Sequence, residues 1–163
     1  MGKKVVFHYE LSNAWLLPIC EISVIKNDTS ASAQYKIGCE KEKNIELDYT
    51  VIQEINAVME NHAGIFKYGL HELEDEADLF DGVVNYFEFA ALDGKSAQFL
   101  TFNIGEIHNP KARFIPSILD CSCAEHTNRK VIPIKAMEVV KTFEEIASIL
   151  IKNGVPKDCF LLG

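Results

Sequence analysis

The sequence predicts a single α+β domain, residues 1–163, in which an antiparallel sheet of five or six strands packs against two amphipathic helices. Three observations lead to this prediction. Apolar residues alternate with polar ones in three N-terminal stretches, a hairpin signal divides residues 83–104, and apolar residues recur with a helical period in two other stretches. A chain of 163 residues is large enough to bury one hydrophobic core.

The central hairpin over residues 83–104 is the clearest local signal. Two apolar runs flank Asp93 and Gly94, and Asp-Gly between alternating hydrophobic residues favours a tight turn. A two-residue loop would place apolar and polar side chains together on each face of the hairpin. A three-residue loop, with Gly94 at positive φ, instead pairs Phe87 with Phe99 and separates the two kinds of side chain. We therefore predict the three-residue loop.

The first forty residues predict a three-strand antiparallel meander. Apolar and polar residues alternate over residues 3–11, 19–25 and 33–39, as in half-buried strands. His8 falls on the more polar side of the first of these strands. We interpret it as a solvated or hydrogen-bonded strand residue, because no catalytic partner accompanies it in the sequence.

The first helix is expected over residues 50–62. Thr50 and Gln53 fit a capping box, in which a Thr hydroxyl and a Gln side chain each satisfy a free backbone N–H of the first turn. The apolar residues that follow Thr50 form one stripe at helical spacing, with polar residues opposite. This pattern predicts a helix with one face against the sheet.

The second helix ends near Asn153, and its sequence allows two starts, at Lys135 or at Thr142. Residues 159–162 at the end of the chain are too apolar for a free tail. We expect them to dock against the sheet, or against a second subunit in a homodimer.

The net charge of −8 is concentrated in one part of the chain. Residues 71–106 hold nine acids and one base, a sum of −8, whereas the segments before and after sum to −2 and +2. The sequence has no basic stripe that could neutralise phosphates, which disfavours nucleic acid as a partner.

Apolar runs and cysteine usage bear on the compartment. The longest apolar run spans seven residues, against the roughly 20 that a membrane-spanning helix needs. No membrane span and no signal peptide are therefore expected. The five cysteines are an odd number in a chain that does not need disulfides for stability, so we expect reduced thiols and a cytoplasmic location.

The acidic segment around residues 72–81 is the main candidate binding surface. Leu70, Leu73, Ala77 and Phe80 recur at helical spacing and predict a short helix or turn with one buried edge. A calcium-binding EF-hand is excluded, because Ala77 and Phe80 occupy positions that need an oxygen ligand and a glycine. The side chains expected to face outward are Glu72, Glu74, Asp75, Glu76, Asp78 and Asp81.

These charges lead to the preferred hypothesis on function. We expect the protein to be a non-enzymatic intracellular binding protein, of the adaptor or immunity-protein kind, that engages a basic protein partner through an acidic surface. The competing interpretation of the same charges is a solvated face with no partner.

Two alternative functions remain. Cys121, Cys123 and His126 could serve a thiol- or metal-dependent enzyme, with His108 as a distant fourth ligand. Their C-x-C spacing differs from the usual C-x2-C of zinc sites, and acidic neighbours disfavour a reactive thiolate, so we expect neither a metal nor a cofactor there. The second alternative is a small-molecule site near Trp15, which is either a core residue or an exposed anchor.

Overall fold

The computed structural model describes residues 2–13, 15, 17–66, 69–74, 83–102, 107–117 and 133–162. In these residues the chain forms nine strands, two α-helices and two 3-10 helices. The strands are β1 (Lys4–Ser12), β2 (Pro18–Lys26), β3 (Ala31–Ile37), β4 (Lys43–Leu47), β5 (Leu70–Leu73), β6 (Val84–Ala90), β7 (Ser96–Thr101), β8 (Arg113–Pro116) and β9 (Ile134–Lys135). The α-helices are α1 (Tyr49–Asn61) and α4 (Ala136–Lys152), and the 3-10 helices are η1 (Ala63–Ile65) and η2 (Lys157–Phe160).

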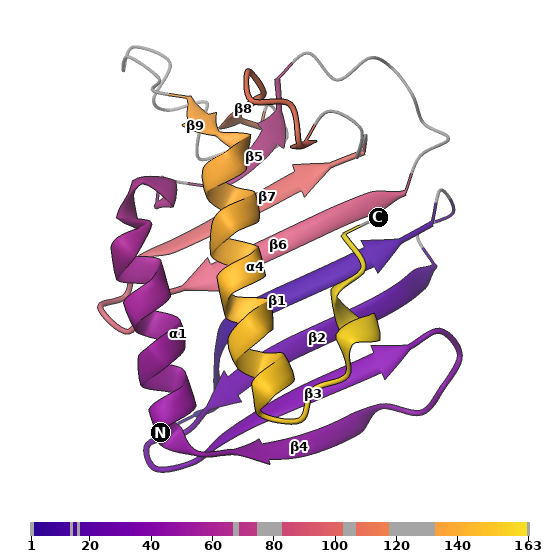
Figure 1. Ribbon diagram of the computed structural model, residues 1–163, viewed down its shortest axis with the longest axis vertical. Helices are drawn as coiled ribbons and strands as arrows, with labels where there is room; N and C mark the ends of the chain where they lie inside the picture. Colours follow the sequence, from indigo (N-terminus) through magenta and orange to yellow (C-terminus); the bar gives the residue numbers. More distant parts are fainter. Residues whose placement is uncertain are drawn as a thin grey trace.

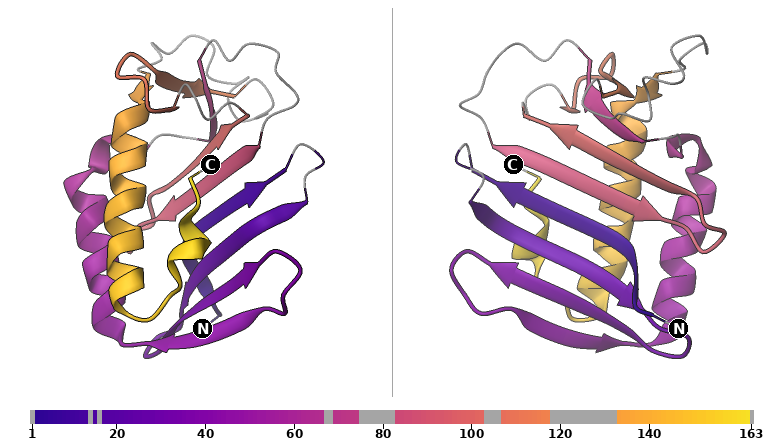
Figure 2. Two further views of the ribbon diagram at one scale, coloured as in Figure 1. Left: turned by 45° about the vertical axis from the view of Figure 1, so that its right-hand side comes forward. Right: turned by 180° about the vertical axis from the view of Figure 1, so that it is seen from behind.

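The described strands form one sheet in the order β4-β3-β2-β1-β6-β7-β5-β8-β9. Adjacent strands are antiparallel except β5 and β7, which are parallel. Both α-helices lie on the same face of this sheet (Figure 1). Seen from behind, the central strands stand in front of the helices (Figure 2). We call the face with α1 and α4 the helix face and the other the open face, because no helix of the described residues covers it.

The sheet confirms the α+β class but has nine described strands rather than the five or six expected. One of the additional strands corrects the interpretation of the acidic segment. Leu70–Leu73 is a strand, not a helix or turn, and it lies between β7 and β8. These partners lie more than 20 residues away in sequence, and tertiary pairing overrides a weak local period. The rest of that predicted helix, residues 75–81, lies outside the described residues.

The predicted hairpin register is confirmed. Phe87 pairs with Phe99 in the β6–β7 ladder, and the φ of Gly94 is 94°. The loop closes with a hydrogen bond of 2.8 Å from the Ala91 N–H to the Lys95 carbonyl. Both helices contact this hairpin. The Leu92 N–H donates a hydrogen bond to the Asn56 side chain of α1, and Phe143 of α4 packs against Phe87 of β6.

Helix α1 begins one residue earlier than expected, and its cap is Asp48 rather than Thr50. The Asp48 carboxylate accepts a hydrogen bond of 2.9 Å from the Thr50 N–H and therefore satisfies a donor that the helix itself leaves free. The buried stripe matches the sequence pattern and consists of Val51, Ile52, Ile55, Val58 and Met59.

Helix α4 begins at Ala136, so the earlier of its two expected starts is correct. Thr142 does not cap the helix. It is buried, and its hydroxyl donates a hydrogen bond of 2.7 Å to the Glu138 carbonyl within the helix. An internal partner of this kind satisfies the hydroxyl without ending the helix.

Phe143 of α4 lies at the centre of the aromatic core. Its ring centroid is 4.6 Å from that of Tyr9, 5.4 Å from that of Phe87 and 6.3 Å from that of Phe7. All four side chains are 0 to 2% exposed. Tilted and edge-on contacts at these distances are favourable aromatic geometries. This cluster fixes α4 against β1 and β6.

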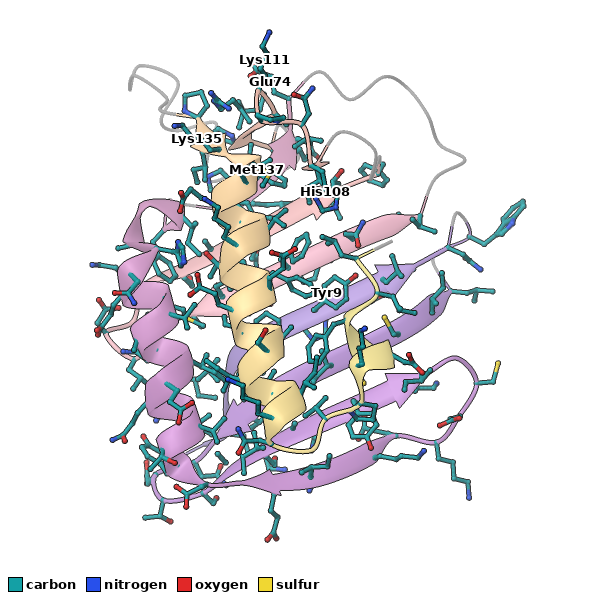
Figure 3. All side chains as sticks on the ribbon, viewed as in Figure 1. Tyr9, Glu74, His108, Lys111, Lys135 and Met137 are labelled. Atoms are coloured by element: carbon teal, nitrogen blue, oxygen red, sulfur yellow. The ribbon has the colours of Figure 1, made fainter. Side chains whose placement is uncertain are left out.

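The C-terminal segment docks against the sheet, as expected for apolar residues 159–162. Cys159 of η2 is fully buried, and the Tyr9 hydroxyl donates a hydrogen bond of 2.7 Å to the Leu161 carbonyl. Tyr9 lies between α4 and this segment (Figure 3). None of the helices in the described ranges is both long and apolar enough to cross a membrane.

His62 joins the two helices at one end. Its Nδ1 is 2.9 Å from a Glu138 oxygen and its Nε2 is 3.0 Å from a Glu145 oxygen. Partial burial lowers the pKa of His62, but the hydrogen bonds to Glu138 and Glu145 outweigh it, so the pKa lies above its usual value. An imidazolium donates from both nitrogens and fits this arrangement.

Replacement of His62 with Gln tests this link through pH. A raised folded-state pKa stabilises the fold fully below about pH 6.5, the unfolded value, and the stabilisation is lost as pH rises through the raised pKa. We expect the free energy of unfolding to differ more between wild type and His62→Gln at about pH 6 than at about pH 8.5. Urea denaturation at both pH values measures this, and an equal difference at both would contradict the charged bridge.

Replacement of Phe143 with Ala tests the aromatic core. We expect a loss of about 3–5 kcal/mol in the free energy of unfolding, because the cavity would lie among buried rings that cannot collapse into it. Ile151→Ala on the same helix is the matched control, since Ile151 is 39% exposed and its truncation should cost much less. Urea denaturation of both variants gives the comparison; similar losses would show that Phe143 is not central.

Candidate functional site

The open face of the sheet carries polar side chains at its centre. Phe7 and Tyr9 of β1 contact α4, and successive side chains of a strand point to opposite faces. His8 and Glu10 therefore point to the open face. Both are half-buried, whereas the residues that alternate with them are fully buried.

Strand β2 adds two polar residues beside them. In the β1–β2 ladder Ser23 lies opposite His8, and Glu21 lies opposite Glu10. A ring nitrogen of His8, one carboxylate oxygen of Glu10 and one of Glu21 lie within 4.8 Å of one another. We call these three residues the His8 cluster.

Two serines orient the members of the His8 cluster. His8 Nδ1 is 2.7 Å from Ser23 Oγ, and the Ser12 hydroxyl donates a hydrogen bond of 2.6 Å to Glu10 Oε1. His8 Nε2 and Glu10 Oε2 are left facing each other at 3.8 Å, a distance too long for a hydrogen bond. The side chain of His8 is 16% exposed, so its position is fixed by its neighbours.

Strand β6 borders the His8 cluster on the other side. Glu88 lies opposite His8 and Tyr86 lies opposite Glu10. The Tyr86 hydroxyl donates a hydrogen bond of 3.1 Å to Glu88. Burial, and next the charge of Glu88, raise the pKa of Tyr86. Tyr86 therefore stays protonated at neutral pH and serves as a hydrogen-bond donor beside the cluster.

Further carboxylates share the open face. Strand alternation and register place five of them on the strands from β4 to β5 in the sheet order. They are Glu10, Glu21, Glu46, Glu72 and Glu88. Apart from His8, the one base at an outward position of these strands, counted over described residues, is Lys36, opposite Glu21. We call this surface the acidic face.

The acidic residues proposed from sequence are only partly described. Glu72 belongs to the acidic face and is half-buried on β5. Glu74 is exposed just beyond β5, and its N–H donates to the Arg113 carbonyl. Figure 3 places Glu74 at the same end of the molecule as Lys111 and Lys135. Asp75, Glu76, Asp78 and Asp81 lie outside the described residues.

Cys121, Cys123 and His126 lie outside the described residues, and His108 is exposed.

The described cysteines Cys20, Cys39 and Cys159 are free thiols. Burial raises the pKa of Cys20, and burial followed by the charges of Cys20 and Asp158 raises that of Cys159 to about 12. Cys20 and Cys159 are therefore protonated at neutral pH and are weak nucleophiles.

Trp15 is an exposed residue rather than part of the core. It is 84% exposed in the turn between β1 and β2, and Leu17 beside it is 62% exposed. The space between α1 and the β6–β7 hairpin leaves no room for a water molecule. The structure therefore places Trp15 on the surface.

Comparisons with protein-family models, with curated proteins and with solved structures found no match to this chain.

The sequence interpretation missed the His8 cluster. It treated His8 as isolated because its partners, Glu21 and Ser23, belong to another strand. A signal was present: His8 and Glu10 are two residues apart on one predicted strand, and Glu21 and Ser23 are two apart on the next. The register of the meander, which sequence alone did not define, would have brought the two pairs together.

Replacement of Glu21 with Gln tests the repulsion between Glu10 and Glu21 in the His8 cluster. Glu21 lies opposite Glu10 on β1, which repels it, and opposite Lys36 on β3, which attracts it. The change is therefore made in a Lys36→Gln background, where the attraction is removed, and we expect Glu21→Gln to gain about 0.2–1 kcal/mol in the free energy of unfolding there. Urea denaturation in the presence of a chelator measures it. Glu144→Gln in the same background, at an exposed position of α4, is the control and should change little. A loss of stability on Glu21→Gln in this background would contradict the repulsion between Glu10 and Glu21.

Proposed function

We propose that the protein is a non-enzymatic binding protein that engages a basic protein partner through the acidic face. The observation that supports this is the outward placement of five carboxylates and one lysine on seven strands, on a face that no described helix covers. The adaptor or immunity-protein role expected from the charge count agrees with this placement.

The physical basis is long-range attraction followed by pairing. Carboxylates on adjacent strands, about 5 Å apart, add their fields within the screening length of about 8 Å at physiological salt. Such a field speeds the encounter with a partner rich in Lys and Arg. Because hydrogen bonds from Ser12 and Tyr86 hold Glu10 and Glu88 in place, these two side chains lose little entropy on binding.

The acidic segment around residues 72–81 extends this surface in sequence. Glu72 lies at an outward position of β5, and five further acids follow it in the next nine residues. We infer that the partner covers the acidic face from β2 to β5. The free thiols of the described cysteines agree with a reducing intracellular setting, so we place this binding in the cytoplasm.

The test is charge reversal on the acidic face. Glu72→Lys combined with Glu88→Lys changes the net charge from −8 to −4 and should keep the fold, because a Lys side chain can extend its amine to solvent. In affinity capture from source cells, we expect wild type to retain basic proteins that the double variant releases. With a purified captured protein, the variant should show slower association and a weaker dependence on salt.

The control makes the same change in net charge on the helix face. Glu54→Lys with Glu144→Lys alters exposed positions of α1 and α4 and should leave capture unchanged. If both double variants lose the same proteins equally, net charge and not the acidic face explains binding. If neither variant loses any, the proposal is wrong.

A further inference from the structure

We propose that the His8 cluster is a binding site for one divalent first-row transition-metal ion, such as Mn²⁺ or Zn²⁺. His8 would supply Nε2, and Glu10 and Glu21 would each supply a carboxylate oxygen. The site does not depend on the basic partner proposed above, and each proposal can fail without the other.

The orientation of His8 fits the role of a ligand. A ligating histidine coordinates through one ring nitrogen while the other donates its N–H to a neighbouring acceptor. Ser23 Oγ lies 2.7 Å from Nδ1 and can accept a proton from it, and in that tautomer the lone pair is on Nε2. Nε2 faces Glu10 at 3.8 Å, so in that tautomer the lone pair points toward Glu10.

The orientation of Glu10 fits the same role. Its Oε1 accepts a hydrogen bond of 2.6 Å from the Ser12 hydroxyl, whereas its Oε2 is the atom nearest Nε2 of His8. One oxygen is therefore held by the protein and the other is directed into the cluster. This division of roles is the usual one for a carboxylate ligand with an outer hydrogen-bond partner.

The spacing of the ligand atoms fits one ion. Metal–ligand bonds of about 2.0–2.2 Å at tetrahedral angles separate neighbouring ligand atoms by roughly 3.3–3.6 Å. The observed 3.8 Å between His8 Nε2 and Glu10 Oε2 is within about half an ångström of that value. The third ligand, Glu21, lies opposite Glu10 in the ladder, and each of the three residues has a ligand atom within 4.8 Å of one on each of the other two. Small side-chain rotations bring all three atoms to one ion.

The chemistry of the ligands selects the class of ion. An imidazole nitrogen favours first-row transition metals over Mg²⁺ and Ca²⁺, which prefer oxygen ligands alone, and the two carboxylates favour Mn²⁺ and Zn²⁺ over Cu⁺. A divalent ion would also offset the repulsion between Glu10 and Glu21 on neighbouring strands. The two strands that carry all three ligands pair with each other and have partners on both sides, so the ligands lie on a rigid part of the sheet.

The experiment uses the full chain with Mn²⁺ as the first probe and Zn²⁺ as the second. In ¹⁵N NMR spectra, paramagnetic Mn²⁺ should broaden the amide signals of β1 and β2 around His8, and Zn²⁺ should shift the same signals and displace Mn²⁺. Both effects should saturate at one ion per chain. The location of the broadening distinguishes this site from any site at cysteines, which favour Zn²⁺ over Mn²⁺.

Three variants and one control define the ligands. Glu21→Gln and His8→Gln should each weaken Mn²⁺ binding at least about 10-fold, and Ser23→Ala should weaken it by about 10-fold through loss of the orienting partner. Glu46→Gln removes the same charge from the same face, on β4, and should leave the affinity within about twofold, because only long-range charge is lost.

A stability measurement gives a second readout. Saturating Mn²⁺ should raise the melting temperature of wild type more than that of Glu21→Gln, since an ion that binds the folded state stabilises it. The proposal is overturned if neither ion affects β1 and β2, or if Glu46→Gln weakens binding as much as Glu21→Gln. The second result would indicate diffuse attraction to the acidic face.

Discussion

The contact of Phe143 with the aromatic side chains of β1 and β6 is the constraint on which the rest of the structure depends. Because Tyr9 and Phe87 must face α4 to meet this ring, every second residue of both strands is committed to the opposite face. A shift of either strand by one residue would bury His8 or Glu88 beneath the helix and expose an aromatic ring. The aromatic core therefore determines which polar residues meet on the open face, although it contains none of them.

The open face carries an electrostatic cost that the core must offset. Glu10 and Glu21 lie directly opposite each other on two central strands, where side chains have less freedom to separate than at an exposed edge. Hydrogen bonds from Ser12 to Glu10 and from Tyr86 to Glu88 reduce the cost of holding carboxylates at half-buried positions. They also fix the direction of each carboxylate. A carboxylate that is held in one direction is preorganised for binding a cation or a basic side chain.

The sequence was sufficient wherever local rules and global packing agreed. The register of the β6–β7 hairpin followed from Asp93-Gly94 and the polarity of two adjacent strands, and the buried stripe of α1 followed from its period. It was insufficient where distant segments decide the outcome: Leu70–Leu73 has helical spacing but forms a strand because β7 and β8 supply its hydrogen bonds. The His8 cluster was missed for the same reason, since its ligands come from two strands whose mutual register no short motif reports.

The two proposed uses of the open face make different demands on its residues. A diffuse field that attracts a basic partner depends on the number of carboxylates, so Glu46 and Glu72 contribute to it much as Glu21 does. An ion site depends on three atoms and their orientation, so uncharged Ser12 and Ser23 matter more to it than a distant carboxylate. The two serines contribute nothing to a long-range field, yet both donate to or accept from members of the His8 cluster. Their placement is therefore the feature that distinguishes a built site from an acidic surface.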